Sequence, residues 1–385
     1  MFWGPGDWVS TLLWFIFLII FLWLGPRMML FQVLNVLEKE ANEMEMLAKK
    51  AEEKVSFAIL RKKDKKVRQK VSEFLDFFSI YPVDLDPAGI IRKLDHLVKN
   101  SEEKVKSFLL NLNPKITKTQ EKDLKAALSG AITARQIAKI VRHYVEIVKK
   151  YKMLQLALIL QMQLPLIKNL LKASVKATEA FINEIPIGDS IGPLVAAKLM
   201  KGKAKKFEKE EFIVVETKIA GKKVFVAKAL GPGATTGYPG KFLKKFIKRN
   251  KITRIITVDA ALKLEGEATG SIAEGVGVAM GGIGVERYEI EEIAVEHGIM
   301  LDAIAIKQSH EEALQPMKKE ILMSANKVVE KIEEIIRLAN KNEKILIIGV
   351  GNTCGVGNSP EEAKKAEKKL KNFYKKEEEN HSFED

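Results

Sequence analysis

Two aspartates hold positions from which carboxylates could do acid–base chemistry. Asp189 lies in the run PIGDSIGP, directly before an apolar segment, and Asp259 directly follows the apolar run 254–258. Two carboxylates in one pocket can share a proton or hold a divalent cation, and either arrangement supports hydrolysis. We therefore expect Asp189 and Asp259 to be the catalytic residues. A plain helix cap is the alternative interpretation of Asp189.

Four glycine-rich loops carry the candidate ligand-binding residues. They are Gly188 in the loop 186–193, Gly231, Thr235 and Thr236 in the loop 230–240, Glu267 and Gly275 in the loop 259–284, and Gly351 and Asn352 in the loop 349–358. Glycines permit tight turns and close backbone approach. A loop as long as the third is usually functional or mobile.

The fourth loop also raises the question of nucleotide binding. It stands between an apolar run and the helix start at Ser359-Pro360, which is where anions bind. It contains neither the G-x-x-x-x-G-K-[ST] string nor the G-x-G-x-x-G string. Structural glycine turns are therefore the alternative to a nucleotide site.

The chain has one cysteine, Cys354, which rules out an intramolecular disulfide and fits a reducing compartment.

The elements that would position these residues follow residue 183. Short β-rich runs alternate there with helical ones, which predicts a mostly parallel sheet covered by helices on both faces. The expected strands are 212–217, 223–229, 254–258, 301–306 and 344–350, and the expected helices are 194–200, 286–297, 311–340 and 360–374. Ligands collect at the carboxyl ends of such strands, where all four loops lie.

Residues 28–183 have the spacing of helices. Apolar residues from Leu30 to Ala48 recur at i, i+3, i+4 and i+7, which predicts a helix running to about Lys70 that packs on a partner or on the chain itself. A basic cluster at 61–68 would suit an anionic leaflet if this helix folds back; a solvated face is the alternative. The uncharged run 153–167 is too short to span a bilayer, so we expect a core or subunit-interface helix there.

The first residues predict a membrane anchor. The run from Trp8 to Leu24 has seventeen residues without a charge, about 25 Å of helix. Tryptophans lie near both of its ends, and Gly25-Pro26 marks its exit. A cleaved signal peptide would need a basic start and a small-residue cleavage site, which are missing. Positive charge accumulates after the run, which predicts a single-pass protein of the cell membrane with its N-terminus outside and its bulk in the cytoplasm.

The charge and composition of the chain limit the kinds of partner that we expect. The chain has 385 residues and a net charge of +14, with 30% charged residues. A Lys- and Glu-rich surface is typical of hyperthermophiles, and a basic balance attracts anionic membranes or nucleic acid. No motif for specific nucleic-acid recognition is present. The expected partners are the lipid bilayer and further copies of this chain.

The whole chain resembles an uncharacterised archaeal family of membrane proteins, one of the domain-of-unknown-function families. The resemblance rests on the anchor, the helical middle and the runs GDSIGPLVAAKLM, GPGATTGYPGK and VDAALKLEGEATGSIAEGVGVAMGGIGVERYEIE. The resemblance implies no activity. The residues themselves predict the domain order 1–27 anchor, 28–183 helical region, 184–374 α/β domain and 375–385 disordered tail.

A more distant resemblance concerns residues 185–310. The string Asp189-Ser-Ile-Gly-Pro193 is similar to the D-x-x-G-P element of spore proteases and hydrogenase-maturation proteases, and Val258-Asp259-Ala260 looks like the second acid of the spore protease. The resemblance implies a phosphorylase/hydrolase-like fold with Asp189 and Asp259 as its acids. Those families place a strand and a G-x-G-N turn before the first acid. Here the run KILIIGVGN, ending at Asn352, looks like that strand and turn, so we expect a circularly permuted arrangement in which Asn352 meets Asp189.

Three function classes remain open from the residues. The leading hypothesis is a membrane-anchored peptidase-like or other hydrolase that uses the two aspartates, alone or with a divalent metal. A non-catalytic oligomeric scaffold and a nucleotide-binding sensor are the alternatives. The substrate, the metal and the number of subunits cannot be read from the sequence.

Overall fold

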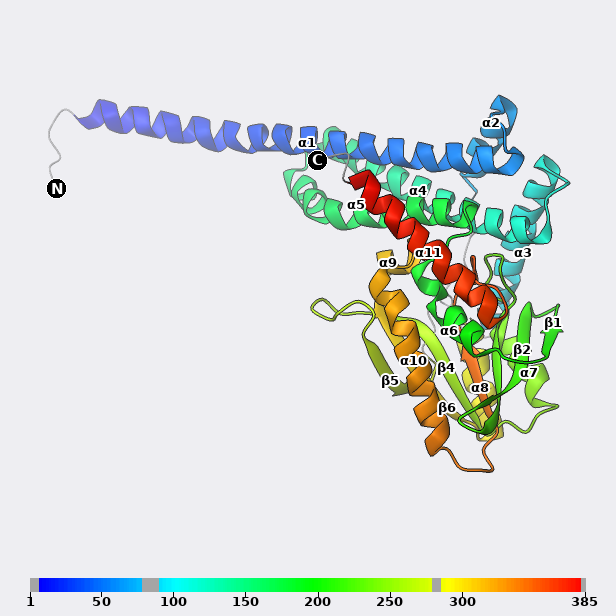
Figure 1. Cartoon of the computed structure of the whole chain (residues 1–385). Coiled ribbons are helices and arrows are strands. Elements are labelled where there is room, and N and C mark those ends of the chain that lie inside the picture. The colour runs from blue at the N-terminus through cyan, green and yellow to red at the C-terminus, as the bar shows by residue number, and fades with distance from the viewer. Residues whose placement is uncertain (1–6, 78–89, 279–284, 382–385) are drawn as a thin grey trace. The chain divides into compact units, whose positions relative to one another are not determined.

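A computed structural model describes residues 7–77, 90–278 and 285–381 of the chain. It divides into two compact units: the first comprises residues up to Lys50 together with 133–172, and the second comprises 51–132 and 173–385. The predicted fold class is confirmed: a helical N-terminal and middle region precedes a mixed sheet with helices on both faces (Figure 1). Some residues that the sequence singles out lie outside the described part of the chain. They are the helix-breaking pairs Tyr81-Pro82 and Asp86-Pro87, and the glycines 281, 282 and 284 of the third loop.

Five long helices form the first half of the described chain. They are α1 (Asp7–Leu60), α2 (Lys65–Phe74), α3 (Ile90–Leu112), α4 (Lys118–Tyr151) and α5 (Leu154–Ile182). The apolar stripe predicted from Leu30 to Ala48 is the buried face of α1. α3 ends at Leu112, just before Asn113-Pro114, and Thr117 Oγ1 accepts from Gln120 N at 3.2 Å to begin α4.

The anchor and the following helix are one element, which the sequence did not predict. Pro26 lies inside α1 and does not end it. The expected helix end near Lys70 was wrong, because Arg61 takes a positive φ of 55° and α1 ends at Leu60. Asp64 then caps α2 by accepting from Lys66 N and Val67 N.

Two helices in the described part of the chain are long and apolar enough to cross a membrane, by length and composition alone: α1 and α5. The apolar side chains of α1 before Leu30 are exposed, among them Trp14, Phe17 and Leu22. α5 is longer than the run 153–167 suggested, and one of its faces is buried while Ile159, Met162 and Leu166 on another are exposed.

The sheet has seven strands in the order β1-β2-β3-β7-β4-β6-β5. Its central strands β3, β7, β4 and β6 are parallel, and the outer strands pair antiparallel. The strands are β1 (Ala204–Phe207), β2 (Phe212–Ile219), β3 (Lys222–Ala229), β4 (Arg254–Leu262), β5 (Ile272–Val276), β6 (Met300–Gln308) and β7 (Ile345–Gly349). A turn at Ala220-Gly221 joins β2 to β3, with positive φ at both residues.

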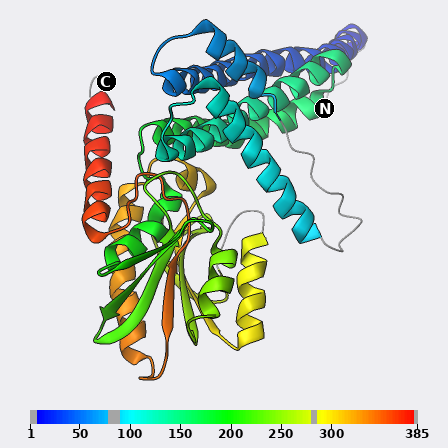
Figure 2. The ribbon, with the colours of Figure 1, turned by 90° about the vertical axis from the view of Figure 1, so that its right-hand side faces the viewer.

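Helices cover both faces of the sheet (Figure 2). α6 (Ile191–Leu199), α10 (Lys319–Leu338) and α11 (Pro360–His381) pack on one face, and α7 (Pro239–Ile247) and α8 (Val285–His297) pack on the other. The buried strand β7 contributes side chains to both cores, Ile345 and Ile347 to one and Leu346 and Ile348 to the other. This explains its continuous apolar sequence.

Four details differ from the sequence analysis. The helix expected at 311–340 is two helices, α9 (His310–Leu314) and α10, because Pro316 interrupts it. β4 continues through Asp259, so that residue lies within a strand and not after it. The third loop contains β5, a strand that the sequence analysis missed. α11 ends at His381 instead of Tyr374, since the Lys and Glu residues of the expected disordered tail are good helix formers.

Candidate functional site

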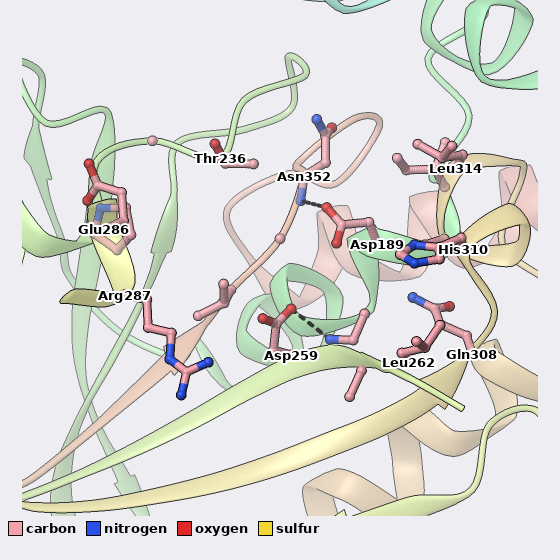
Figure 3. Close-up of a pocket in the computed structure, with 18 of the residues that line it drawn as sticks. Asp189, Thr236, Asp259, Leu262, Glu286, Arg287, Gln308, His310, Leu314 and Asn352 are labelled. Carbon is pink, nitrogen blue, oxygen red and sulfur yellow. Dashed lines mark hydrogen bonds between the residues drawn. The ribbon is translucent and has the colours of Figure 1, made fainter. Parts of the chain in front are cut away.

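A pocket of about 830 Å³ opens at the carboxyl ends of the parallel strands. Its wall takes residues from the ends of β4 and β6, from the loop after β7, from the turn that precedes α6 and from α3, all within the second unit. Figure 3 shows Asp189 and Asp259 entering this pocket from different elements. Pockets of this size hold small molecules or short peptide segments.

Asp189 is placed by a 3₁₀ turn, η1 (Gly188–Ser190), that leads into α6. Its Oδ2 accepts a hydrogen bond from the backbone N–H of Asn352 at 2.8 Å. The expected meeting of Asn352 and Asp189 is therefore observed, and β7 lies at the centre of the sheet. Burial raises the pKa of Asp189, and the hydrogen bond from Asn352 opposes this shift.

Asp259 lies in β4, with 3% of its surface exposed. Its Oδ1 accepts from Ala260 N at 2.7 Å. Burial raises the pKa of Asp259 well above its ordinary value, and the nearby negative charge of Asp189 raises it further. The two carboxyls thus interact electrostatically within one pocket. Asp189 is not a plain helix cap, since its side chain makes no cap hydrogen bond to α6.

Glycines bring the backbone close around Asp189. A Cβ added at Gly351, whose φ is +124°, would stand 2.0 Å from the carbonyl oxygen of Asp189. A Cβ at Gly188 would stand 2.1 Å from the carbonyl oxygen of Glu312. At Gly192, a Cβ would meet the carbonyl oxygens of Val350 and Val258 at 2.1 and 2.3 Å. Only glycine permits α6 to lie this close to the ends of β7 and β4.

Gln308 is a pocket residue that the sequence analysis missed. It is the last residue of β6, it is 2% exposed, and it lines the pocket beside Leu262 and His310 (Figure 3). Neither Oε1 nor Nε2 has a hydrogen-bond partner in the described structure. A buried unpaired amide destabilises a fold, so this side chain points to a ligand that supplies the missing partners. The expected strand 301–306 ended two residues too early to include it.

The remaining candidates divide between the pocket and its surroundings. Thr236, Gly351 and Asn352 line the pocket. Thr235 lies behind it and donates to Glu211 Oε2 at 2.6 Å, while Gly231 N donates to Asn358 Oδ1 at 3.1 Å. These two residues stabilise the second loop instead of lining the pocket.

Glu267 and Gly275 are not among the residues that line the pocket. Glu267 accepts from Leu264 N at 2.6 Å and pairs with Lys307 at 3.7 Å. Gly275 belongs to β5, and the space beside its Cα is open. The structure therefore brings together Asp189, Asp259, Thr236, Gly351 and Asn352, and it leaves these two residues outside.

The fourth loop uses its amides within the protein. The N–H groups of Asn352, Thr353, Cys354, Gly355, Val356 and Asn358 each donate to a protein oxygen. Phosphate binding at such a loop depends on free amides that point at the ligand. Cys354 is buried, and burial raises the pKa of its thiol, so it has the environment of an inert structural cysteine.

Lys228 is a second feature that the sequence did not reveal. Its side chain is fully buried, and its ammonium donates to Ala229 O at 2.9 Å and to Asn358 Oδ1 at 3.0 Å. Burial lowers the pKa of Lys228 to about 7, and Glu362 opposes the shift. It links the end of β3 to the fourth loop and does not line the pocket.

Residues from α3, from α8 and from the segment just before α7 also line the pocket. Lys241 pairs with Asp95 at 2.9 Å, and Tyr238 donates to Glu102 at 2.9 Å. Glu286 Oε2 accepts from Gly240 N at 2.7 Å, and burial raises the pKa of Glu286 to about 7. Within residues 7–77, 90–278 and 285–381, no three His, Cys, Asp or Glu side chains form a cluster that could hold a metal ion.

Comparison with known proteins places this layout in a family. Residues 11–184 match the model of a protein of unknown function (DUF1512), N-terminal domain, and residues 187–357 match the DUF1512 C-terminal domain. The C-terminal match spans the strands and loops that build the pocket. A search of curated proteins gives no match. The matches to the N-terminal and the C-terminal domain of this family follow each other along the chain. The chain therefore belongs to the DUF1512 family.

Proposed function

We propose that this protein is a membrane-anchored hydrolase of amide bonds, peptidase-like, with Asp189 and Asp259 as its acid–base pair. One observation carries the proposal: two buried carboxyls share a pocket, and the charge of one raises the pKa of the other. Such a pair retains one proton at a pH where isolated aspartates are ionised. It therefore offers a general acid and a general base together.

The reaction follows from that protonation state. The ionised carboxylate takes a proton from a water molecule as the water oxygen attacks the carbonyl carbon of the substrate. The protonated carboxyl gives its proton to the amide nitrogen as the C–N bond breaks. The N–H groups of Asn352 and Ala260 each hold one carboxyl oxygen in place, which leaves the other oxygen for water and substrate.

Gln308 favours an amide as the substrate. A peptide group has one donor and one acceptor, and a glutamine side chain offers both in return. The unpaired Oε1 and Nε2 of Gln308 could bind such a group in the pocket that holds the two aspartates. The meeting of Asn352 with Asp189 supports the resemblance to the protease families in a permuted order.

In an alternative form of the proposal, a divalent cation bound by two ionised carboxylates would replace the shared proton. The two carboxylates would supply two oxygen ligands, and water or substrate would supply the others. The nucleotide-sensor alternative gains no support from the fourth loop, whose amides bond internally. The same proposal includes anchoring through α1, whose apolar side chains in the N-terminal run are exposed. It also includes a cytoplasmic location for the bulk of the chain and an archaeal source.

The proposal is tested with a fluorescence-quenched peptide library and the full-length protein in detergent, with and without added Mg²⁺ or Zn²⁺. Cleavage by the natural protein should fall at least a hundredfold in Asp259→Asn and in Asp189→Asn, the upper range of a general acid or base contribution. The matched control is Asp123→Asn. Asp123 is also buried, and burial raises its pKa to about 7, but it lies outside the pocket. Equal activity in all four proteins would refute the acid–base pair.

A further inference from the structure

The turn between α4 and α5 carries an unusual set of side chains. Lys149, Lys150 and Lys152 surround Tyr151, whose surface is 61% exposed, and Met153 follows with 47% of its surface exposed. The ammonium of Lys150 stands 5.1 Å from the centre of the Tyr151 ring. No acidic residue occurs between Glu146 and Glu179. Lysines, a tyrosine and apolar side chains together are typical of segments that lie at a membrane surface.

Ion pairs fix the position of this turn along α1, within the first unit. Arg142 pairs with Glu45 at 2.7 Å and Lys149 pairs with Glu38, so α4 runs antiparallel to α1. α5 returns parallel to α1, and Lys168 pairs with both Glu40 and Glu43, at 2.8 and 2.7 Å. The fourteen residues from Lys168 back to Leu154 rise about 21 Å. Fourteen residues back along α1 from Glu40 and Glu43 are Pro26 and Met29. Leu154 therefore lies level with this part of α1.

Burial along α1 agrees with this register. The first buried apolar residues of α1 are Leu30 and Val33, and the apolar residues Met28 and Met29 before them are exposed. Ala157, Leu160 and Leu164 are the buried residues of α5 at the matching level. Neighbouring helices therefore begin to pack on α1 at the level where α5 begins, to within about one helical turn.

The bilayer should end at the same level. A span needs about 20 apolar residues to cross a hydrocarbon core of about 30 Å. Counted from Trp8, the core then ends near Met28, and the headgroup layer extends a further turn or more of helix. The start of α5 coincides with that layer, and the Lys149–Glu38 pair places Tyr151 level with about Val36, roughly 12 Å beyond Met28.

We propose that the α4–α5 turn, with Lys150, Tyr151, Lys152 and Met153, lies in the headgroup layer of the membrane and binds anionic lipid. This inference rests on the proposed anchoring through α1. The occupant is lipid because Lys150 and Lys152, which pair with no acid in the described part of the chain, attract anionic headgroups, and because a second copy of the chain would bring the same positive charges.

The test places one environment-sensitive fluorophore on the full chain in vesicles that contain phosphatidylglycerol. Separate proteins carry Phe17→Cys, Met153→Cys or Met46→Cys, all labelled with the same dye. Cys354 stays unlabelled because it is buried with a raised thiol pKa. Met46 is 59% exposed and lies about 25 Å farther along α1 than Met29, so it serves as the distant control.

Nitroxide lipids with the spin label at the headgroup should quench the dye at Met153 several-fold more than the dye at Met46. Lipids labelled in the acyl chain should quench the dye at Phe17. Replacing Lys150 and Lys152 with glutamine should at least halve the quenching at Met153 and leave that at Phe17 unchanged.

Each other outcome is decisive. Quenching at Phe17 with none at Met153 would overturn this inference and leave the anchor standing, and no quenching at Phe17 would overturn the anchor itself. If the dye at Met153 responds to dilution with unlabelled protein and not to nitroxide lipid, the turn binds a second copy and the lipid assignment is wrong.

Discussion

At the scale of single residues, the pocket and the turn beside it combine groups that a stable fold would avoid. Gln308 buries two unpaired amide atoms, and Ser190 buries an unpaired hydroxyl among the described residues. Removing an unsatisfied buried polar atom stabilises a protein by roughly 1–3 kcal/mol when the replacement fills the same space. Function is the reason to retain such a group when a ligand pairs with it.

Gln308→Met should therefore raise the thermal midpoint by a few degrees and raise KM for the cleaved peptide about tenfold or more, since an amide partner in the pocket is lost. Ser190→Ala is the control, because Ser190 also carries an unpaired buried atom but lies outside the pocket lining. It should gain stability with KM unchanged. A Gln308→Met protein with unaltered KM would remove the argument for an amide substrate. Calorimetry and steady-state kinetics supply both readouts.

The sequence predicts part of the site and misses the rest for physical reasons. Asp189, Thr236 and Asn352 are found because they stand in glycine-rich loops at strand ends, where pockets form. Gln308 and Lys228 are missed because their type and position are those of ordinary surface residues. Only tertiary packing shows that both are buried. Burial of a lysine cannot be read from the residues beside it in the chain.

At the scale of elements, the close packing of α6 against the strand ends sets the position of Asp189. Gly192→Ala would force a Cβ into the carbonyls of Val350 and Val258, so we expect a loss of about 1–3 kcal/mol and a lower thermal midpoint. Gly275→Ala is the matched control, because nothing lies within 4 Å of its Cβ position. Equal thermal midpoints for the two variants would show that α6 does not pack this closely.

Periodicity predicts the long elements well and the short ones poorly. The buried strands β4 and β7 and the hairpin of β2 and β3 follow from apolar runs and turn residues. β1 and β5 are short outer strands with few apolar residues, so their sequences look like loops. The edge position of such strands is decided by the partner that they pair with.

At the scale of the whole molecule, α1 joins the apolar N-terminal run to the first unit without a break. The sequence analysis expected two segments separated at Gly25-Pro26, because proline and glycine usually end helices. Here the missing hydrogen bond of Pro26 is tolerated within the helix. The outward N-terminus, the cytoplasmic bulk and the association of several chains remain predictions.

The central claim is that Asp189 and Asp259 act as one coupled pair. Infrared titration of the protein with carboxyl-labelled aspartate measures the pKa of Asp259 directly, in the natural chain and in Asp189→Asn. In the natural chain the pKa of Asp259 should lie well above that of an ordinary aspartate. Removing the charge of Asp189 should lower that pKa, and burial should keep it above the ordinary value. An identical pKa of Asp259 in the two proteins would contradict the coupled pair and the hydrolase proposed from it.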